Sequence, residues 1–180
     1  MKRNKIKKVY KILAGLLTII FYWVIFPLFL FWFSFKVQIG RLNIPNLLAY
    51  GIGFIVVVYG LYWYIGAGIA QHKSGVKISR NYKSTSFLSY LFQLNPPDKL
   101  ITTGIYAKSR NPMFFGYTII LIGMDILLSS ISILIIFIPA FIVFDFIWIK
   151  LEEKNLRKKF GNEFTNYQNS TNFLIPNHLF

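Results

Sequence analysis

The sequence predicts an all-α, polytopic membrane protein with about four transmembrane helices, for three reasons. Its 180 residues are 55% hydrophobic and 19% aromatic, more than a soluble domain of this length normally carries. The stretches 12–35 and 42–71 contain no Lys, Arg, Asp or Glu, and each exceeds the roughly 20 residues that a helix needs to cross the hydrocarbon layer. A third apolar stretch, 111–149, has Asp125 and Asp145 as its only charged residues.

The first half of the chain predicts two plain spans, near residues 11–34 and 46–70. The basic start "MKRNKIKK" is typical of a secretory signal, but the apolar run is longer than a signal requires and no small-residue cleavage site follows. We therefore expect a retained anchor. The second span contains small residues that favour close helix contact, namely Gly60, Gly66, Gly68 and Ala70.

The third apolar stretch is long enough for two helices, with a turn at "SSIS", Ser129–Ser132. This division gives spans near 112–129 and 131–151, and the short turn predicts an antiparallel helical hairpin. We divide the chain accordingly. Residues 1–95 are expected to form a two-span scaffold with a basic tail and a polar cytoplasmic connection, and residues 96–180 a second region that contains the hairpin.

The distribution of basic residues predicts the orientation in the membrane. Six lie in the N-terminal tail, two between the first spans, seven in the central loop 71–110 and five from Lys150 onward. Basic residues concentrate in cytoplasmic loops, so both termini and the central loop are expected on the cytoplasmic side. The net charge of +14 predicts contact with anionic lipid headgroups. It does not favour nucleic acid, because the charges flank spans instead of forming one basic patch.

Several chemistries are excluded by residue content. The chain has no cysteine, which excludes disulfides, thiolate metal sites and a cysteine nucleophile. Its two histidines, His72 and His178, are far apart and have no carboxylate at metal-ligand spacing. We therefore expect no metal site.

Two polar clusters lie at the ends of the predicted hairpin. "SRNPMFFG", Ser109–Gly116, precedes its first helix, and "LEEKNLRKKFG", Leu151–Gly161, ends its second. Antiparallel packing places these clusters at the same rim of the membrane. The sequence therefore predicts one polar site at this rim.

The two clusters belong to longer motifs that carry a family resemblance. "PPDKLITTGIYAKSRNPMFFG", followed by "EEKNLRKKFGNEFTNY", resembles the isoprenylcysteine carboxyl methyltransferase and phospholipid methyltransferase superfamily over about residues 96–176. The resemblance implies a small integral membrane enzyme that uses S-adenosylmethionine, with residues 96–180 as its cofactor-binding region. It also implies a membrane lipid or lipidated acceptor, either an isoprenylcysteine carboxylate or a phospholipid amine.

The sequence departs from the family pattern at four positions. Phe114 and Phe164 stand where the pattern often has tyrosine, and Asn111 replaces the histidine of the carboxyl methyltransferases proper. Phe173 stands where some relatives carry an arginine. These differences leave the acceptor open between the two classes.

The resemblance also implies the site residues. The expected catalytic residues are Arg110, Asn111 and Glu152. Carboxylates suit the ammonium and ribose of the cofactor, an arginine suits its carboxylate, and aromatic rings suit its sulfonium cation. The expected cofactor-binding residues are Gly104, Tyr106, Arg110, Asn111, Pro112, Phe114, Gly116, Glu152, Glu153 and Tyr167.

Most of these residues also have a purely structural interpretation. Arg110 can be a membrane flank that extends toward headgroups, and Pro112 suits the first turn of a helix. Glu152 and Glu153 can form a solvated helix face that pairs with Arg157, and we expect this structural role for one of the two. The sequence leaves the roles of the two intramembrane aspartates undecided. Asp145 is expected either to line the deep wall of the pocket or to pair with a lysine near the interface, and Asp125 is expected to be hydrated near the turn.

Two other functions remain open from the sequence. Sterol-type membrane reductases resemble this family in their C-terminal architecture and use a nicotinamide cofactor. A non-enzymatic membrane scaffold is the other alternative, and it predicts no cofactor binding.

Overall fold

The computed structural model describes residues 2–76 and 96–177. The regular secondary structure of these residues is helical, apart from an isolated bridge between Arg41 and Ser130. The predicted boundary at residue 95 and His178 lie outside these ranges. The elements in chain order are α1 (Lys2–Ile20), η1 (Phe21–Ile25), α2 (Phe26–Lys36), α3 (Asn46–Ser74), α5 (Ile105–Lys108), α6 (Pro112–Leu128), η2 (Ile133–Phe137), α7 (Ile138–Phe160) and α8 (Asn162–Ser170).

Three helical stretches of the described chain are long and apolar enough to cross a membrane: Ile12–Lys36, Asn46–Ser74 and Ile133–Phe160. The fourth expected span corresponds to α6, which is apolar but has only 17 residues. The predicted fold class is confirmed, and the chain is an integral membrane protein. The last helix is also longer than expected, since it continues to Phe160 instead of ending near residue 151.

Two of the spans contain a short π-helical segment that ends two residues before a proline. Pro27 follows η1, and Pro139 follows η2. A proline has no N–H to donate, and its ring clashes with the carbonyl four residues earlier. Those carbonyls belong to Trp23 and Ile135, which lie within η1 and η2. The wider turn relieves the clash without breaking either span.

Helices α3 and α6 make backbone contact through glycines spaced seven residues apart. A Cβ atom added to Gly116 would lie 2.5 Å from the Tyr64 nitrogen and 2.7 Å from the Gly60 carbonyl oxygen. The expected packing role of Gly60 is therefore confirmed. Gly68, by contrast, would have nothing within 4 Å of an added Cβ. The same close approach recurs seven residues away on each helix, between Gly53 and Gly123.

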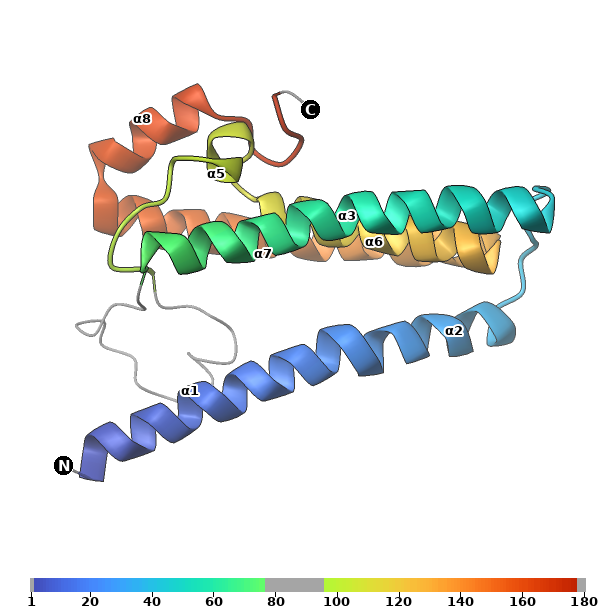
Figure 1. Ribbon diagram of the computed structural model, residues 1–180, viewed down its shortest axis with the longest axis horizontal. Helices are drawn as coiled ribbons and strands as arrows, with labels where there is room; N and C mark the ends of the chain where they lie inside the picture. The colour runs from blue at the N-terminus through green and yellow to red at the C-terminus, as the bar shows by residue number, and fades with distance from the viewer. Residues whose placement is uncertain (1, 77–95, 178–180) are drawn as a thin grey trace.

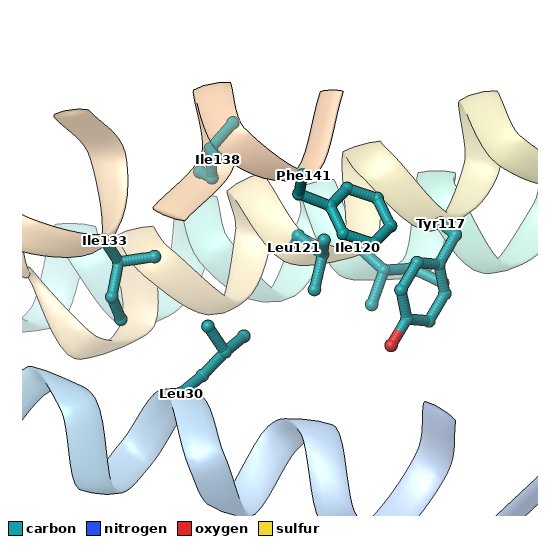
Figure 2. Packing of buried hydrophobic residues seen from close by; sticks show 7 residues of the cluster. All are labelled: Leu30, Tyr117, Ile120, Leu121, Ile133, Ile138 and Phe141. Atoms are coloured by element: carbon teal, nitrogen blue, oxygen red, sulfur yellow. The ribbon is translucent and has the colours of Figure 1, made fainter. Parts of the chain in front are cut away.

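The N-terminal span joins the other helices through its second half. Leu30 of α2 packs into a buried cluster from α6, η2 and α7 (Figure 2), and the Tyr117 hydroxyl donates to the Tyr22 carbonyl at 2.9 Å. Figure 1 shows α1 diverging from α3, α6 and α7. The cluster consists of Leu30, Tyr117, Ile120, Leu121, Ile133, Ile138 and Phe141.

The two ends of the molecule differ. At one end, the loop after α2 pairs with the Ser129–Ser132 turn, where Leu42 N–H donates to the Ser129 carbonyl at 3.0 Å. Ser129 ends α6 in a left-handed conformation, so the predicted turn and hairpin are confirmed. At the other end, α5 and α8 lie beside the α6 start and the α7 end (Figure 1), and this end carries the polar residues.

Candidate functional site

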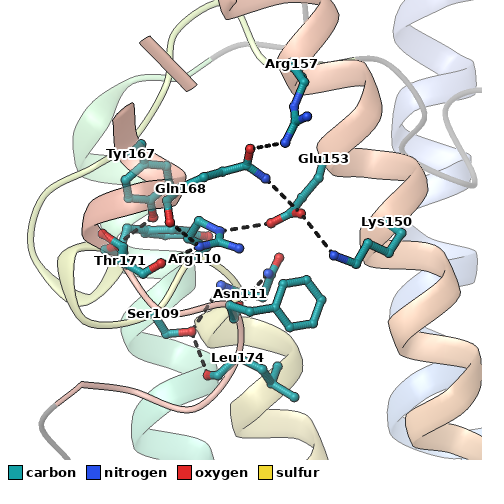
Figure 3. A network of polar contacts seen from close by, with 12 residues as sticks. Ser109, Arg110, Asn111, Lys150, Glu153, Arg157, Tyr167, Gln168, Thr171 and Leu174 are labelled. Atoms are coloured by element: carbon teal, nitrogen blue, oxygen red, sulfur yellow. Dashed lines mark hydrogen bonds and ion pairs between the residues drawn. The ribbon is translucent and has the colours of Figure 1, made fainter. Parts of the chain in front are cut away.

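The two polar clusters meet through a buried ion pair. Arg110 precedes α6, and its Nε donates to Oε1 of Glu153 on α7 at 2.9 Å. The two side chains are only 11% and 8% exposed. The predicted convergence of the clusters at one end of the hairpin is therefore confirmed, as Figure 3 shows.

A C-terminal strap, residues 171–177, holds the same arginine from the other side. Arg110 Nη1 donates to the carbonyls of Gln168, at 2.9 Å, and of Thr171. The Asn111 side-chain amide donates to the Phe173 carbonyl at 2.7 Å, and the Ser109 hydroxyl to the Leu174 carbonyl at 2.7 Å. The strap thus satisfies polar groups that would otherwise be buried without partners.

Gln168 of α8 extends this network to Arg157. Its amide nitrogen donates to Oε2 of Glu153 at 3.1 Å, and its amide oxygen accepts from Nη2 of Arg157. Arg157 therefore contacts Gln168 instead of forming the expected direct pair with a glutamate. Figure 3 shows Gln168 between Arg157, Glu153 and Arg110.

A pocket of about 170 Å³ lies beside this network. Six of the expected cofactor-binding residues line it: Tyr106, Arg110, Asn111, Glu152, Glu153 and Tyr167. Glu152 differs from its neighbour, because no residue in the described ranges forms a hydrogen bond or ion pair with its carboxylate. The pocket therefore has one neutralised carboxylate and one that has no partner among the residues of the described ranges. Its other lining residues are Gln71, Val76, Pro97, Leu100, Ile101, Leu156 and Phe164.

The other four expected residues have different positions. Gly104 has a φ of 65° immediately before α5, which suits glycine. Pro112 is the first residue of α6 and is buried, and Phe114 lies in the same first turn. Gly116 lies at the α3–α6 contact. The structural interpretation of Pro112 is confirmed.

Two tyrosines and a glutamine connect the pocket to the second span. Gln71, at the end of α3, donates to the Tyr106 hydroxyl at 2.7 Å, and the Tyr167 hydroxyl donates to the Tyr106 carbonyl at 2.6 Å. Burial raises the pKa of Tyr106 to about 12 and raises that of Tyr167 as well. Both hydroxyls are therefore protonated near neutral pH.

The sequence interpretation missed four residues that build the site: Gln71, Ser109, Gln168 and Thr171. Gln71 lies next to the last residue predicted for the second span, and its polarity was the available signal. Thr171 acts through its backbone carbonyl, which any residue supplies, so its identity carries no signal. Ser109 and Gln168 are polar residues whose partners are distant in the chain.

The two intramembrane aspartates do not line the pocket. Asp145 is 4% exposed on the buried face of α7, and Asp125 is 1% exposed on α6. Neither carboxylate has a hydrogen-bond partner in the described part of the chain. Asp145 therefore matches neither of its two expected placements, and the turn leaves Asp125 inaccessible to solvent.

The fold and site define an integral membrane protein whose apolar hairpin carries a pocket with two carboxylates at one end. Among the described residues no group of three or more potential ligands for a metal is present. Residues 63–163 match the phospholipid methyltransferase family model. The chain belongs to this family, and the resemblance found in its motifs is confirmed.

A curated relative gives a second comparison. The chain is 31% identical over 125 residues to the Saccharomyces cerevisiae protein-S-isoprenylcysteine O-methyltransferase. The match covers 69% of this chain and 48% of the yeast protein. This chain therefore aligns with about half the length of that relative.

Proposed function

We propose that this protein is a membrane methyltransferase that moves a methyl group from S-adenosylmethionine to a lipid-borne acceptor. The observation that carries the proposal is the difference between the two neighbouring glutamates. Glu153 is held by Arg110 at 2.9 Å, whereas Glu152 lines the pocket with no hydrogen bond or ion pair from the described residues. A partly buried carboxylate of this kind favours a cationic or hydroxyl-bearing ligand.

The residues of the pocket fit the chemical groups of this cofactor. The Glu152 carboxylate can accept from an ammonium group or from ribose hydroxyls. Tyr106, Phe164 and Tyr167 supply aromatic rings, which attract a sulfonium cation by roughly 0.5–2 kcal/mol. Pockets that enclose drug-sized ligands are roughly 300–1,000 Å³. The observed 170 Å³ would therefore enclose only part of a nucleotide of this size.

The expected catalytic residues have different roles in this proposal. Arg110 uses Nε and Nη1 to hold Glu153 and α8, so it acts first as a positioning residue for the pocket wall. Asn111 uses its amide nitrogen on the strap, which leaves its side-chain oxygen as an acceptor beside the pocket. Glu152 is the residue that we assign to direct ligand contact.

The chemistry required from the protein is mainly alignment. S-adenosylmethionine, when bound, supplies a methyl group on a positively charged sulfur that is already a good leaving group. The chain must hold the acceptor atom in line with that group and exclude water. A carboxylate acceptor needs no base. An amine acceptor must lose a proton, and Glu152 is the pocket carboxylate available to take it.

Two acceptor classes are compatible with the family and the relative. The matched family is named for phospholipid methylation, and the yeast relative is named for methylation of isoprenylcysteine. Both acceptors carry a long apolar chain, which suits lateral entry from the bilayer. We therefore propose a lipid or lipidated acceptor, with the cofactor entering from the cytoplasmic side.

A direct comparison of cofactors tests the proposal against its alternatives. Detergent-solubilised protein is incubated separately with radiolabelled S-adenosylmethionine and radiolabelled NADPH, and retained label is measured. We expect retention of the first and competition by S-adenosylhomocysteine. Retention of NADPH alone would favour a membrane reductase, and retention of neither would favour a scaffold.

A further inference from the structure

Lys150 occupies a boundary between the polar site and the apolar surface. It lies on α7, three residues before Glu153, and its side chain is 53% exposed. Its Nζ lies 5.3 Å from the ring centre of Phe146 and 4.8 Å from that of Phe173. Phe146 is 51% exposed on a transmembrane span, so its free surface faces lipid. Lys150 thus places a cation where lipid meets the site.

The aromatic rings hold this cation in place. Phe146 and Phe173 pack edge to face with ring centres 5.5 Å apart, and both rings make a cation–π contact with the Lys150 ammonium. The Phe173 ring also makes a cation–π contact with Arg110, whose Cζ lies 5.7 Å from the ring centre. A cation held over rings loses less conformational freedom on binding an anion than a freely moving lysine does.

Among the described residues, the charge of Lys150 is only weakly balanced. Its nearest carboxylate oxygen, Oε2 of Glu153, is 4.0 Å away, at the limit of an ion pair. The same glutamate already accepts from Arg110 at 2.9 Å and from Gln168 at 3.1 Å. Two cations therefore share one carboxylate, and an exposed pair of this kind contributes little. Lys150 is available to a second anion.

Both acceptor classes place an anion close to the methylated atom. A phospholipid amine is linked to a phosphate, and an isoprenylcysteine ends in a carboxylate that is itself the nucleophile. A lysine binds either group as a point charge. From this geometry we infer that Lys150, set between Phe146 and Phe173, binds the anionic group of the lipid acceptor at the lipid-facing edge of the pocket. This inference rests on the proposed function.

A binding experiment without cofactor tests the inference directly. The full chain in detergent is titrated with N-acetyl-S-farnesylcysteine and, separately, with its uncharged methyl ester, which differs in the one charge. In a third titration, a short-chain phosphatidylethanolamine represents the acceptor class that carries a phosphate. We expect the farnesyl acid to bind more tightly than its ester by about tenfold or more, or the phospholipid to show the equivalent dependence on Lys150. The arm that responds identifies the acceptor class.

Two variants and a control complete the test. Lys150→Gln should lose about tenfold in affinity for the responding lipid, while Lys150→Arg retains it and the ester is unaffected. Lys154→Gln removes an exposed cation one turn further along α7 and should change nothing. Unchanged lipid affinity in Lys150→Gln, or equal losses in both glutamine variants, would overturn the inference.

The cofactor is measured separately, so the two proposals can fail separately. Lys150→Gln should bind S-adenosylhomocysteine as the wild-type chain does. If lipid binding does not depend on Lys150 while S-adenosylhomocysteine binding is intact, only the acceptor site is contradicted. Absence of S-adenosylhomocysteine binding in the wild-type chain would contradict the proposed function instead.

Discussion

Glu152 and Glu153 are adjacent in the sequence but occupy different chemical environments. Oε1 of Glu153 lies 2.9 Å from Nε of Arg110, and the Glu153 side chain is 8% exposed. Glu153 belongs to a network that reaches α8 through Gln168. Glu152 lines the pocket without a hydrogen bond or ion pair from the described chain. We interpret the first as the glutamate that assembles the site and the second as the one that binds the ligand.

The Arg110–Glu153 pair is expected to stabilise the fold. Removing one member of a buried pair leaves an uncompensated charge, which typically costs about 3–5 kcal/mol. Arg110→Ala and Glu153→Ala should each lower the stability of the detergent-solubilised protein by an amount of this order, measured by denaturant unfolding. The double variant should lose less than the sum, because it leaves no unpaired charge. Strictly additive losses would show that the two side chains do not interact.

The glycine contact between α3 and α6 predicts a second stability difference. Gly116→Ala would place a Cβ 2.5 Å from the Tyr64 backbone nitrogen, which forces the helices apart. Gly68→Ala is the matched control, because its Cβ would meet nothing within 4 Å and alanine is the better helix former by roughly 1 kcal/mol. Thermal unfolding should show a lower midpoint for Gly116→Ala and an unchanged or higher one for Gly68→Ala. Equal midpoints would contradict the close packing.

The C-terminal strap is expected to be required for the site. A chain ending at Ser170 loses the Phe173 carbonyl, which accepts from the Asn111 amide. It also loses the Thr171 carbonyl, so that Arg110 Nη1 keeps only its bond to the Gln168 carbonyl. Buried donors without partners cost about 1–3 kcal/mol each, so this truncation should lower both stability and affinity for S-adenosylhomocysteine. A chain ending at Asn177 keeps these carbonyls and should behave as the full chain. If both truncations bind equally well, the strap has no positioning role.

The orientation can be tested with introduced cysteines, because the natural chain contains none. Asn43→Cys lies in the exposed loop before α3, and Asn162→Cys is exposed at the start of α8, near the pocket. The basic flanks predict that the pocket end is cytoplasmic. In intact cells a membrane-impermeant maleimide should therefore label Asn43→Cys but not Asn162→Cys, and permeabilisation should allow both to react. The reverse pattern would place the pocket outside.

The sequence predicted the features that depend on composition and local pattern. Apolar runs predicted the spans, "SSIS" predicted the turn, and the hairpin then predicted that Arg110 lies near the Glu152–Glu153 pair. Pro27 and Pro139 indicated disturbed turns only in retrospect, because a proline-containing span can kink or widen. The end of α7 was placed too early, since its polar last turns pack against α8 instead of reaching lipid.

The remaining features of the site depend on contacts between distant residues. Nothing in "LEEKNL" distinguishes Glu152 from Glu153, because the difference arises from the position of Arg110 and Gln168 in space. The strap binds through backbone carbonyls, which are the same for every residue type. Asp145 was expected near the pocket from its spacing to Glu152, but Glu153, eight residues beyond it, continues the buried face of α7.

The central claim is that the pocket beside the Arg110–Glu153 pair binds an S-adenosyl ligand through Glu152. Calorimetric titration with S-adenosylhomocysteine tests it most directly, using wild-type protein and Glu152→Gln, with Glu163→Gln as a control at an exposed carboxylate on α8. We expect wild type and the control to bind alike and Glu152→Gln to lose about tenfold or more in affinity, with unchanged unfolding. Equal affinity in all three proteins, or no binding by the wild type, would contradict the account.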